Sequence, residues 1–467
     1  MRKCLCYAII QVTETRCNEP VFLWCEVKVM RNEKRKKEIF GAVAAGMCFT
    51  VCLTGCAVAK QEDSNNKETQ NLSTQYQKEK TVAKGEVSDA FRAAYADFSV
   101  NLLRESRAVS DAEGKNTMVS PLSVMTALEM SRYGADGDTR KQMEQVLYGG
   151  MSGEEGRTDL MRFTDGLPNE KDASYIEANS IWFREVTEQK APGQDFLESN
   201  GADFNADIFE ASFGEDTVDD INRWVEEKTD GNVKKILDTI PEDADMYLIN
   251  ASSFDAEWNS EYEESDILKD QEFTCADGTR KKVDLMEGTE REYLCGERET
   301  GFRKEYKEGY SFVALLPDEG IDIDDYVNQL DGAAFLKLME EAQEDTVYTM
   351  LPAFESDTGL ELSDTLKALG MPLAFDKDQA EFPGIFEEPD IPVWIGRVLH
   401  KTHIRVDARG TKAGAATVVE IMAESAAPQD PNEEPKEVYL DRPFVYAIVE
   451  DDTNLPVFIG TVEDLGK

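Results

Sequence analysis

The sequence predicts an α+β fold with large β-sheets. The chain has 467 residues and 41% hydrophobic content, which is enough to bury one large core. Patterns typical of helices and of strands both occur between residues 88 and 467. The strands interleave with the helices but do not alternate with them regularly, as they would in a parallel α/β sheet, so the class is α+β. The first 87 residues have a different composition and are not expected to belong to this fold.

The N-terminal region carries features of a targeting segment. Residues 30–38 are strongly basic, residues 39–54 are apolar or small, and the stretch closes on Leu53-Thr54-Gly55-Cys56. This pattern resembles the signal peptide and processing site of bacterial lipoproteins, which implies removal of residues 30–55 and diacylation of Cys56. A short transmembrane anchor is the alternative, but the apolar run is shorter than the roughly twenty residues that span a bilayer.

The remaining N-terminal residues follow from this interpretation. Because Met30 opens a complete signal peptide, residues 1–29 are interpreted as an upstream mis-start or as a genuine extension. The polar stretch after Cys56 is predicted to form, with the lipidated cysteine, a flexible tether over residues 56–87. Residues 88–467 then form the folded domain, which we expect to be lipid-anchored on the extracellular side of a bacterial cell envelope.

Helices and strands can be assigned to several parts of residues 88–467. Apolar residues at helical spacing after Ser88 predict a helix over 88–106, and a similar pattern that stops at Gly231 predicts one over 217–230. Other segments are rich in β-branched and aromatic residues and are bounded by turn formers. These predicted strands are 310–316, 404–406, 443–449 and 457–462.

The charge is strongly negative and limits the classes of partner. With 94 Asp and Glu against 50 Lys and Arg, the formal net charge is -44. Nucleic acids and anionic lipid surfaces favour basic proteins, so neither is an expected partner except through the lipid anchor. A neutral or basic partner is expected instead, and the alternative is a merely solvated surface that keeps the protein soluble.

Residues that could support catalysis or bind a metal are scarce. The sequence lacks a Gly-x-Ser-x-Gly elbow, a His-Glu-x-x-His helix and a phosphate-binding glycine loop. His400 and His403, the only histidines, lie three apart in a predicted strand and so face opposite surfaces. We therefore expect no enzyme activity, no cofactor and no metal site. Cys275 and Cys295 remain after processing, and whether they pair is left open.

Residues 411–422 form an unusual loop sequence. The segment contains no proline, and its odd- and even-numbered residues, which would form two rows on opposite faces of a strand, differ in character. Both of its charged residues, Lys412 and Glu420, lie in the even-numbered row. The other row contains Thr411, Ala413, Ala415, Thr417, Val419 and Ile421. A small, apolar row suits a segment that must enter a sheet, whereas an alanine-rich loop with accidental parity is the alternative.

Several separate blocks resemble the serpin family, and together they cover essentially all of residues 88–467. The block 116–125 is similar to the family's Asn-x-x-x-Ser-Pro-x-Ser motif at the start of a buried helix. Further blocks follow in the family order at 221–237, 250–258, 366–371, 380–385, 441–449 and 455–460. The order and spacing make the combination highly specific.

The resemblance implies a fold of three β-sheets with eight or nine helices and an exposed reactive loop held in a metastable state. It also implies a polar shutter where the central strands part, formed by Ser120, Ser123, Asn250 and His400. Trp258 is implied at the breach, where loop insertion starts. Ordinary hydrogen-bonded core polarity is the alternative reading of these residues.

The resemblance further identifies a hinge and a cleaved bond. The hinge residues are Gly410, Thr411, Ala413, Gly414, Ala415 and Ala416. Ala408 and Lys412 depart from the acidic residues common at their positions. The family's usual loop length places the reactive bond at Glu424-Ser425. Because the following stretch is long, cleavage between Met422 and Ala423 or between Ala426 and Ala427 is an alternative.

The implied function is inhibition of serine proteases. The protease would cut the loop and remain bound as a covalent acyl complex while the loop enters the central sheet. The apolar residues before the predicted bond favour elastase-like targets, and the protein is expected to be a monomer. A non-inhibitory serpin that acts as a surface binding module is the alternative, favoured by the long acidic stretch after residue 427.

Overall fold

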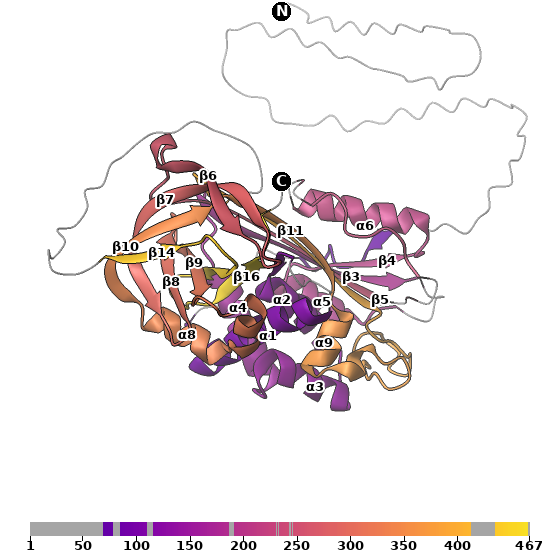
Figure 1. Ribbon diagram of the computed structural model, residues 1–467. Helices are drawn as coiled ribbons and strands as arrows, with labels where there is room; N and C mark the ends of the chain where they lie inside the picture. The colour runs from indigo at the N-terminus through magenta and orange to yellow at the C-terminus, as the bar shows by residue number, and fades with distance from the viewer. Residues whose placement is uncertain are drawn as a thin grey trace, which may run out of the picture. The chain divides into compact units, whose positions relative to one another are not determined.

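The structure is a computed structural model. It describes residues 69–77, 85–109, 115–185, 191–229, 231, 233–241, 244, 246–411 and 435–465. All of them belong to one compact unit, Ser64–Lys467. Over these ranges the chain forms nine α-helices and two sheets, in agreement with the α+β class predicted (Figure 1). No helix within them is long and apolar enough to cross a membrane.

The helices include both that the sequence predicts. The first begins one residue after Ser88, whose Oγ accepts a hydrogen bond from the backbone N–H of Phe91 at 3.1 Å, so Ser88 caps the helix as expected. The second spans 215–228 and ends three residues before Gly231. The α-helices are α1 Asp89–Val109, α2 Pro121–Arg132, α3 Gly137–Tyr148, α4 Gly153–Gly166, α5 Gln194–Asp203, α6 Glu215–Lys228, α7 Ile323–Gln329, α8 Gly332–Glu340 and α9 Ser363–Leu369, with short 3-10 helices η1 Glu264–Asp266 and η2 Pro372–Phe375.

The first sheet has seven strands in the order β1-β4-β3-β5-β13-β12-β11. Its strands are β1 Gln70–Asn71, β3 Ala173–Arg184, β4 Asp207–Ala211, β5 Met246–Glu257, β11 Phe354–Glu361, β12 Arg397–Asp407 and β13 Gly410–Thr411. The central strands β5 and β12 are parallel and pair directly over 247–253 and 397–403, while β13 lies between them at the other end.

The second sheet has the order β14-β10-β7-β8-β9-β15-β16-β2, and β6 pairs with β7 beside this path. Its strands are β2 Thr117–Val119, β6 Ile267–Thr274, β7 Arg280–Cys295, β8 Glu299–Glu305, β9 Tyr310–Pro317, β10 Gln343–Pro352, β14 Lys436–Tyr439, β15 Phe444–Glu450 and β16 Pro456–Val462. The resemblance implies three sheets, whereas the described residues form two. The sixteen-residue β7 pairs with β6, β10 and β8 along its length and so joins two of the expected sheets into one. All four predicted strands are present, within one residue at each end for three of them and inside the longer β12 for the fourth.

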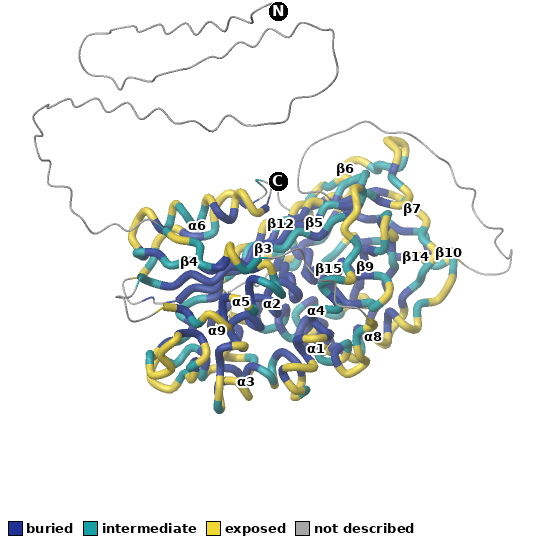
Figure 2. The backbone as a smooth tube through the Cα atoms, turned by 180° about the vertical axis from the view of Figure 1, so that it is seen from behind, coloured by how far each residue is buried: buried dark blue, intermediate teal, exposed yellow. Residues whose placement is uncertain are grey.

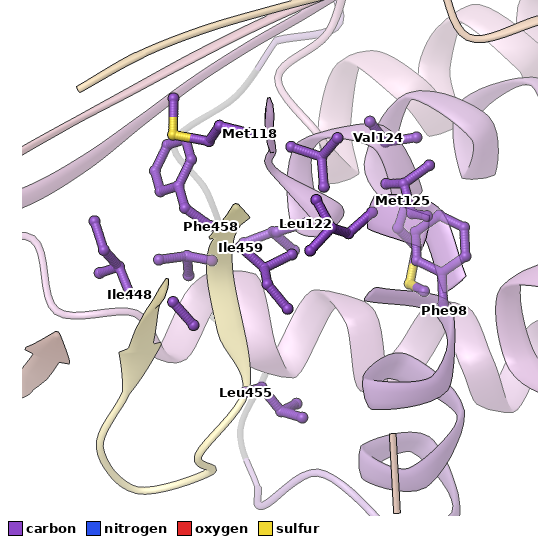
Figure 3. Close-up of a cluster of buried hydrophobic side chains, with 14 of the residues drawn as sticks. Phe98, Met118, Leu122, Val124, Met125, Ile448, Leu455, Phe458 and Ile459 are labelled. Carbon is purple, nitrogen blue, oxygen red and sulfur yellow. The ribbon is translucent and has the colours of Figure 1, made fainter. Parts of the chain in front are cut away.

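The hydrophobic core lies on both faces of the first sheet. Every residue of α2 is buried, and this helix packs against β5, β3 and β16. Figure 3 shows Leu122 of α2 beside Ile459 of β16, with Phe98 of α1 near Met125. On the opposite face, Trp224 of α6 packs edge-on against Trp182 of β3. Figures 1 and 2 show α6 on one side of the sheet and α1, α2 and α9 on the other.

Residues 69–77 differ from the expected tether. β1 pairs antiparallel with β4 and forms an edge of the first sheet, and the fully buried Ser73 donates from Oγ to the carbonyl of Ala206 at 2.7 Å. The side-chain amide of Asn71 donates to Asp207 Oδ1, also at 2.7 Å. The prediction of a tether over 56–87 was therefore wrong for residues 69–77, because the polar groups of this segment form hydrogen bonds with residues at a distant strand.

Candidate functional site

The central strands β5 and β12 are wedged apart at one end by the two residues of β13. Gly410 pairs with Glu257 of β5 on one side and Asp407 of β12 on the other. Thr411 likewise pairs with Ala256 and Val406. The segment that the sequence identifies as a hinge thus begins its course inside the first sheet, as an antiparallel strand between two parallel ones.

The turn before β13 is held by Trp258, which the resemblance places at the breach. Its indole N–H donates to the carbonyl of Asp407 and its backbone N–H to the carbonyl of Arg409, both at 2.8 Å. The fully buried indole stacks on the ring of Tyr306, with 4.2 Å between ring centroids and 9° between planes. Trp258 therefore fixes the turn that leads into β13.

Only glycine fits at position 410. A Cβ atom there would lie 2.0 Å from the carbonyl oxygen of Ala256, far inside any real contact. The missing side chain lets the backbone of β13 approach β5 closely. The sequence predicts Gly410 as part of the hinge, and close backbone approach gives the physical reason for a glycine at this position.

The orientation of Thr411 sets the orientation of the loop that follows. Its side chain is fully buried, and its Oγ1 is hydrogen-bonded to the hydroxyl of Tyr306, which belongs to the main core. Thr411 therefore points into the core below the sheet. Since successive residues of a strand alternate between faces, the row of Thr411 is the inward row of any strand that continues β13.

The predicted shutter residues form one row of hydrogen bonds across the sheet. The backbone N–H of Ser120, the N-cap of α2, donates to His400 Nε2 at 3.0 Å. The other ring nitrogen of His400 is bonded to Asn250 Oδ1, and His400 and Asn250 are directly paired across β12 and β5. The backbone N–H of Ser123 donates to Ser120 Oγ at 3.4 Å. The structure thus brings all four together, while their part in opening the sheet stays a prediction.

The hydrogen bonds fix the protonation of His400. Because a backbone N–H donates to Nε2, the ring proton lies on Nδ1 and is donated to Asn250. Complete burial disfavours the imidazolium and lowers the pKa of His400 to about 3. His400 is therefore neutral at physiological pH and links α2 to β5.

Asn179, and through it Glu177, extend this row, and sequence reasoning missed both. The side-chain amide of Asn250 donates to Asn179 Oδ1 at 2.8 Å, and Asn179 donates in turn to Glu177 of the same strand, β3. Asn179 lies opposite Asn250 in the register of β3 and β5. No short motif surrounds Asn179, and only its cross-strand pairing marks it as part of the row. Tyr306, the partner of Thr411 and Trp258, was missed for the same reason.

The other predicted site residues have different outcomes. Ala413, Gly414, Ala415 and Ala416 of the hinge lie outside the described residues. Cys56 and all candidates for the reactive bond also lie outside them: Met422, Ala423, Glu424, Ser425, Ala426 and Ala427. Cys275 is buried and Cys295 exposed, and both are free thiols. His403 shares β12 with His400 but is not fully buried, so the two histidines are separated as expected.

Comparison with known proteins identifies relatives over most of the chain. A sequence model of the family described as "Serpin (serine protease inhibitor)" matches residues 93–465. Serpin B8 of Bos taurus is 30% identical over 388 residues, which is 80% of this chain and 98% of that protein. Alpha-1-antiproteinase of Rattus norvegicus is 27% identical, over 79% of this chain and 88% of its own length.

Solved structures agree with this assignment. The crystal structure of the thermophilic serpin tengpin in the native state is 41% identical, covers 85% of this chain and all of its own, and has a TM-score of 0.77. The same protein in the latent state covers 82% of this chain at 38% identity, with a lower TM-score of 0.70. The model match, the relatives and the fold agree with the geometry of the central sheet, and the chain therefore belongs to the serpin family.

Proposed function

We propose that this chain inhibits serine proteases by trapping them after they cut the loop of residues 412–434. The observation that carries the proposal is the position of β13, which already lies between β5 and β12. A loop that continued along this path would add a full strand to the centre of the sheet. Such an insertion needs a sheet that can open and a loop that fits, and this chain has features suited to both.

The register of β13 gives a specific path for the inserted loop. Thr411 lies opposite Ala256 and Val406, so in an antiparallel continuation Thr417 comes to lie between Asn250 and His400. The inward row contains only small or apolar residues and threonine, and both charged residues point outward. The hydroxyl of Thr417 can donate and accept hydrogen bonds, so it can replace the bond between Asn250 and His400 that the insertion breaks.

The trapping chemistry follows the acyl-transfer steps of the protease. The protease serine attacks the carbonyl carbon of Glu424, an ester forms, and the amine of Ser425 leaves with the catalytic proton. Insertion of about fourteen residues at roughly 3.3 Å each then carries the acylated protease some 45 Å. Distortion of its oxyanion hole and catalytic triad stops water from cleaving the ester, because hydrolysis needs the same aligned groups. The serpin itself catalyses no step.

The class of target follows from the loop sequence. Val418, Val419, Ile421, Met422 and Ala423 suit the small apolar pockets of elastase-like proteases, whereas cleavage after Glu424 suits glutamyl-specific ones. Trapping either class of protease would require no metal or cofactor from the inhibitor.

The proposed location rests on the N-terminal sequence. Residues 30–55 match the pattern of a lipoprotein signal peptide, after which Cys56 would be the acylated first residue of the mature chain. The inhibitor would then act at the extracellular side of a bacterial envelope, held by its lipid. Labelling with a radioactive fatty acid tests this, because Cys56→Ser is expected to abolish incorporation while the folded domain is unchanged.

The decisive experiment is incubation of the mature chain with elastase-like, glutamyl-specific and trypsin-like serine proteases. Denaturing electrophoresis is expected to show an SDS-stable adduct with at least one of them. Mass spectrometry of the released peptide, expected to start at Ser425, identifies the cleaved bond. Loop cleavage without an adduct across the panel would contradict trapping and favour the non-inhibitory alternative.

A further inference from the structure

The outward face of β14, β10 and β7 carries a cluster of tyrosine, methionine and glutamate side chains. Across β14 and β10, Glu437 lies opposite Tyr348 and Tyr439 opposite Met350. Across β10 and β7, Met350 lies opposite Glu287. Glu437 and Glu287 are exposed, and the other three are partly exposed. We call Glu287, Tyr348, Met350, Glu437 and Tyr439 the acidic tyrosine face.

The alternation of these strands separates this face from the core. Val438, Thr349 and Met286, which occupy the opposite rows of the three strands, are almost completely buried. The five residues of the face therefore point away from the core on neighbouring strands and form one continuous surface.

The electrostatic character of the face is negative. Partial burial and the carboxylates of Glu437 and Glu287 raise the pKa of Tyr439. The helix η1, which carries the exposed Glu264, contacts β7. Lys436, next to Glu437 in β14, places its ammonium over the ring of Tyr293 at 5.6 Å, and Arg291 is exposed further along β7. Acidic groups thus dominate around the two tyrosines.

The face is connected directly to the loop that a protease would cut. β14 begins at Lys436, shortly after residues 412–434, and is the edge strand of its sheet. Because a chain extends at most about 3.5 Å per residue, a protease held at Glu424 stays within roughly 45 Å of Glu437. A protease is itself at least about 30 Å across, so its flank can reach the face while its active site holds the loop.

From this position and charge, we propose that the acidic tyrosine face is a docking surface for a positively charged surface of the target protease. The inference rests on the proposed inhibitory function and adds to it a preference for proteases that are basic beside their active site. Tyrosine and methionine are enriched in protein interfaces because they supply contact area with few polar groups to desolvate. The glutamates would accelerate encounter with a basic partner by electrostatic attraction.

The test is the association rate constant of inhibition for the full mature chain and its E287K/E437K variant. The protease is one that forms an SDS-stable adduct with the unmodified chain and has a basic surface. We expect the variant to associate about tenfold more slowly at low ionic strength, and the difference to shrink at 1 M salt, where the Debye length is about 3 Å. The stoichiometry of inhibition is expected to stay the same, because the face takes no part in insertion.

The matched control is E226K/E227K, which makes the same change in charge on the exposed surface of α6. Both Figure 1 and Figure 2 place α6 on the other side of the molecule from β10 and β14. This control should associate within about twofold of the unmodified chain, and both variants should unfold at the unmodified midpoint. Equal rate constants for the two variants would overturn the docking surface and leave trapping intact. The absence of any adduct across the protease panel would overturn both proposals.

Discussion

His400 has an environment that favours one protonation state and one orientation. It accepts a hydrogen bond from the N-terminus of a fully buried helix and donates one to the neighbouring central strand. Protonation of Nε2 would place a buried charge against the N–H of Ser120 and remove that hydrogen bond. The connection between α2 and β5 therefore depends on a neutral imidazole.

This environment predicts a loss of stability in mild acid. The pKa of His400 is about 3 in the folded chain and near 6.5 when unfolded, so the unfolded chain binds the extra proton between these values. The stabilisation is complete above about pH 6.5 and declines below it by up to about 1.4 kcal/mol per pH unit. Guanidinium unfolding at pH 7.5 and 5.5 measures the effect. The unmodified chain should lose about 1 kcal/mol more than His400→Gln, and equal losses would contradict the assignment.

A second prediction at the scale of one residue is that replacing Gly410 lowers the free energy of unfolding. Gly410→Ala places a methyl group against the carbonyl of Ala256, so β13 must leave its position or the strands must separate. We expect a loss of about 1–3 kcal/mol in the free energy of unfolding, measured with guanidinium. Gly359→Ala in β11 is the control, because the nearest atom to its Cβ is the flexible side chain of Lys401, at 3.3 Å. A similar loss in both variants would argue against the close approach of β13 and β5.

At the scale of an element, the fixed orientation of Thr411 predicts different effects for neighbouring loop residues. Ala415 shares the row of Thr411 and would face the core after insertion, whereas Ala416 would face away from it. Ala415→Glu should therefore stop insertion and turn the inhibitor into a substrate, because an unpaired carboxylate cannot be buried. Ala416→Glu should retain trapping.

The pair is measured by the stoichiometry of inhibition against one protease that the unmodified chain traps. We expect a rise of at least about tenfold for Ala415→Glu and less than about twofold for Ala416→Glu. The two variants introduce the same residue at neighbouring positions that would face opposite sides of the inserted strand. Equal stoichiometries would therefore show that the inserted loop does not keep the register of β13.

A further prediction concerns Ser73, which follows β1 and lies before the blocks that resemble the serpin family. Ser73 Oγ accepts from the backbone N–H of Ile208 at 3.0 Å and donates to the carbonyl of Ala206. Ser73→Ala leaves both buried groups without this partner and should cost about 1–3 kcal/mol in thermal or guanidinium unfolding. Thr74→Ala, at the exposed neighbouring position, should change stability by less than about 0.5 kcal/mol. If the two variants were equally stable, the buried hydrogen bonds of Ser73 would contribute nothing to the folded state.

Elements with strong local patterns could be predicted from the sequence, and those made by distant partners could not. The helix after Ser88 and the strands 310–316 and 457–462 follow from their own periodicity and composition. β1 has only two residues and a polar sequence, and Asn71 of β1 and Ser73 just after it form their hydrogen bonds with Ala206, Asp207 and Ile208, more than 130 residues away. Tertiary contact overrides local propensity in such a segment.

In the candidate site too, residues that are defined by distant partners could not be predicted from the sequence. The family resemblance identified His400, Asn250, Ser120 and Ser123 by matched position, but Asn179 enters the row only through the register of β3 with β5. A sequence without an alignment does not contain that register. The two-residue β13 is likewise defined by its neighbours on both sides, since its own pattern continues into the following loop.

At the scale of the whole molecule, the central sheet is less completely paired than it would be with the loop inserted. β5 and β12 pair directly over seven residues, and β13 occupies the space between them over only two more. Inserting the loop would replace the one parallel pairing by two antiparallel ones along the full strands. The intact chain is therefore expected to be the less stable of two folded states, kept by the continuous loop and the polar row at His400.

This difference predicts that cutting the loop raises stability. After cleavage within residues 412–434, the inserted strand would bury Val419 and Ile421, which contribute about 3–6 kcal/mol together, in addition to the new backbone hydrogen bonds. Guanidinium unfolding of intact and loop-cleaved chains compares the two states, and the cleaved chain should unfold at a clearly higher midpoint. Ala415→Glu provides the control, because it can be cut but should not insert, so its midpoint should not rise. A cleaved, unmodified chain that unfolds at the intact midpoint would mean that the loop does not enter the sheet, even though β13 marks the start of its path.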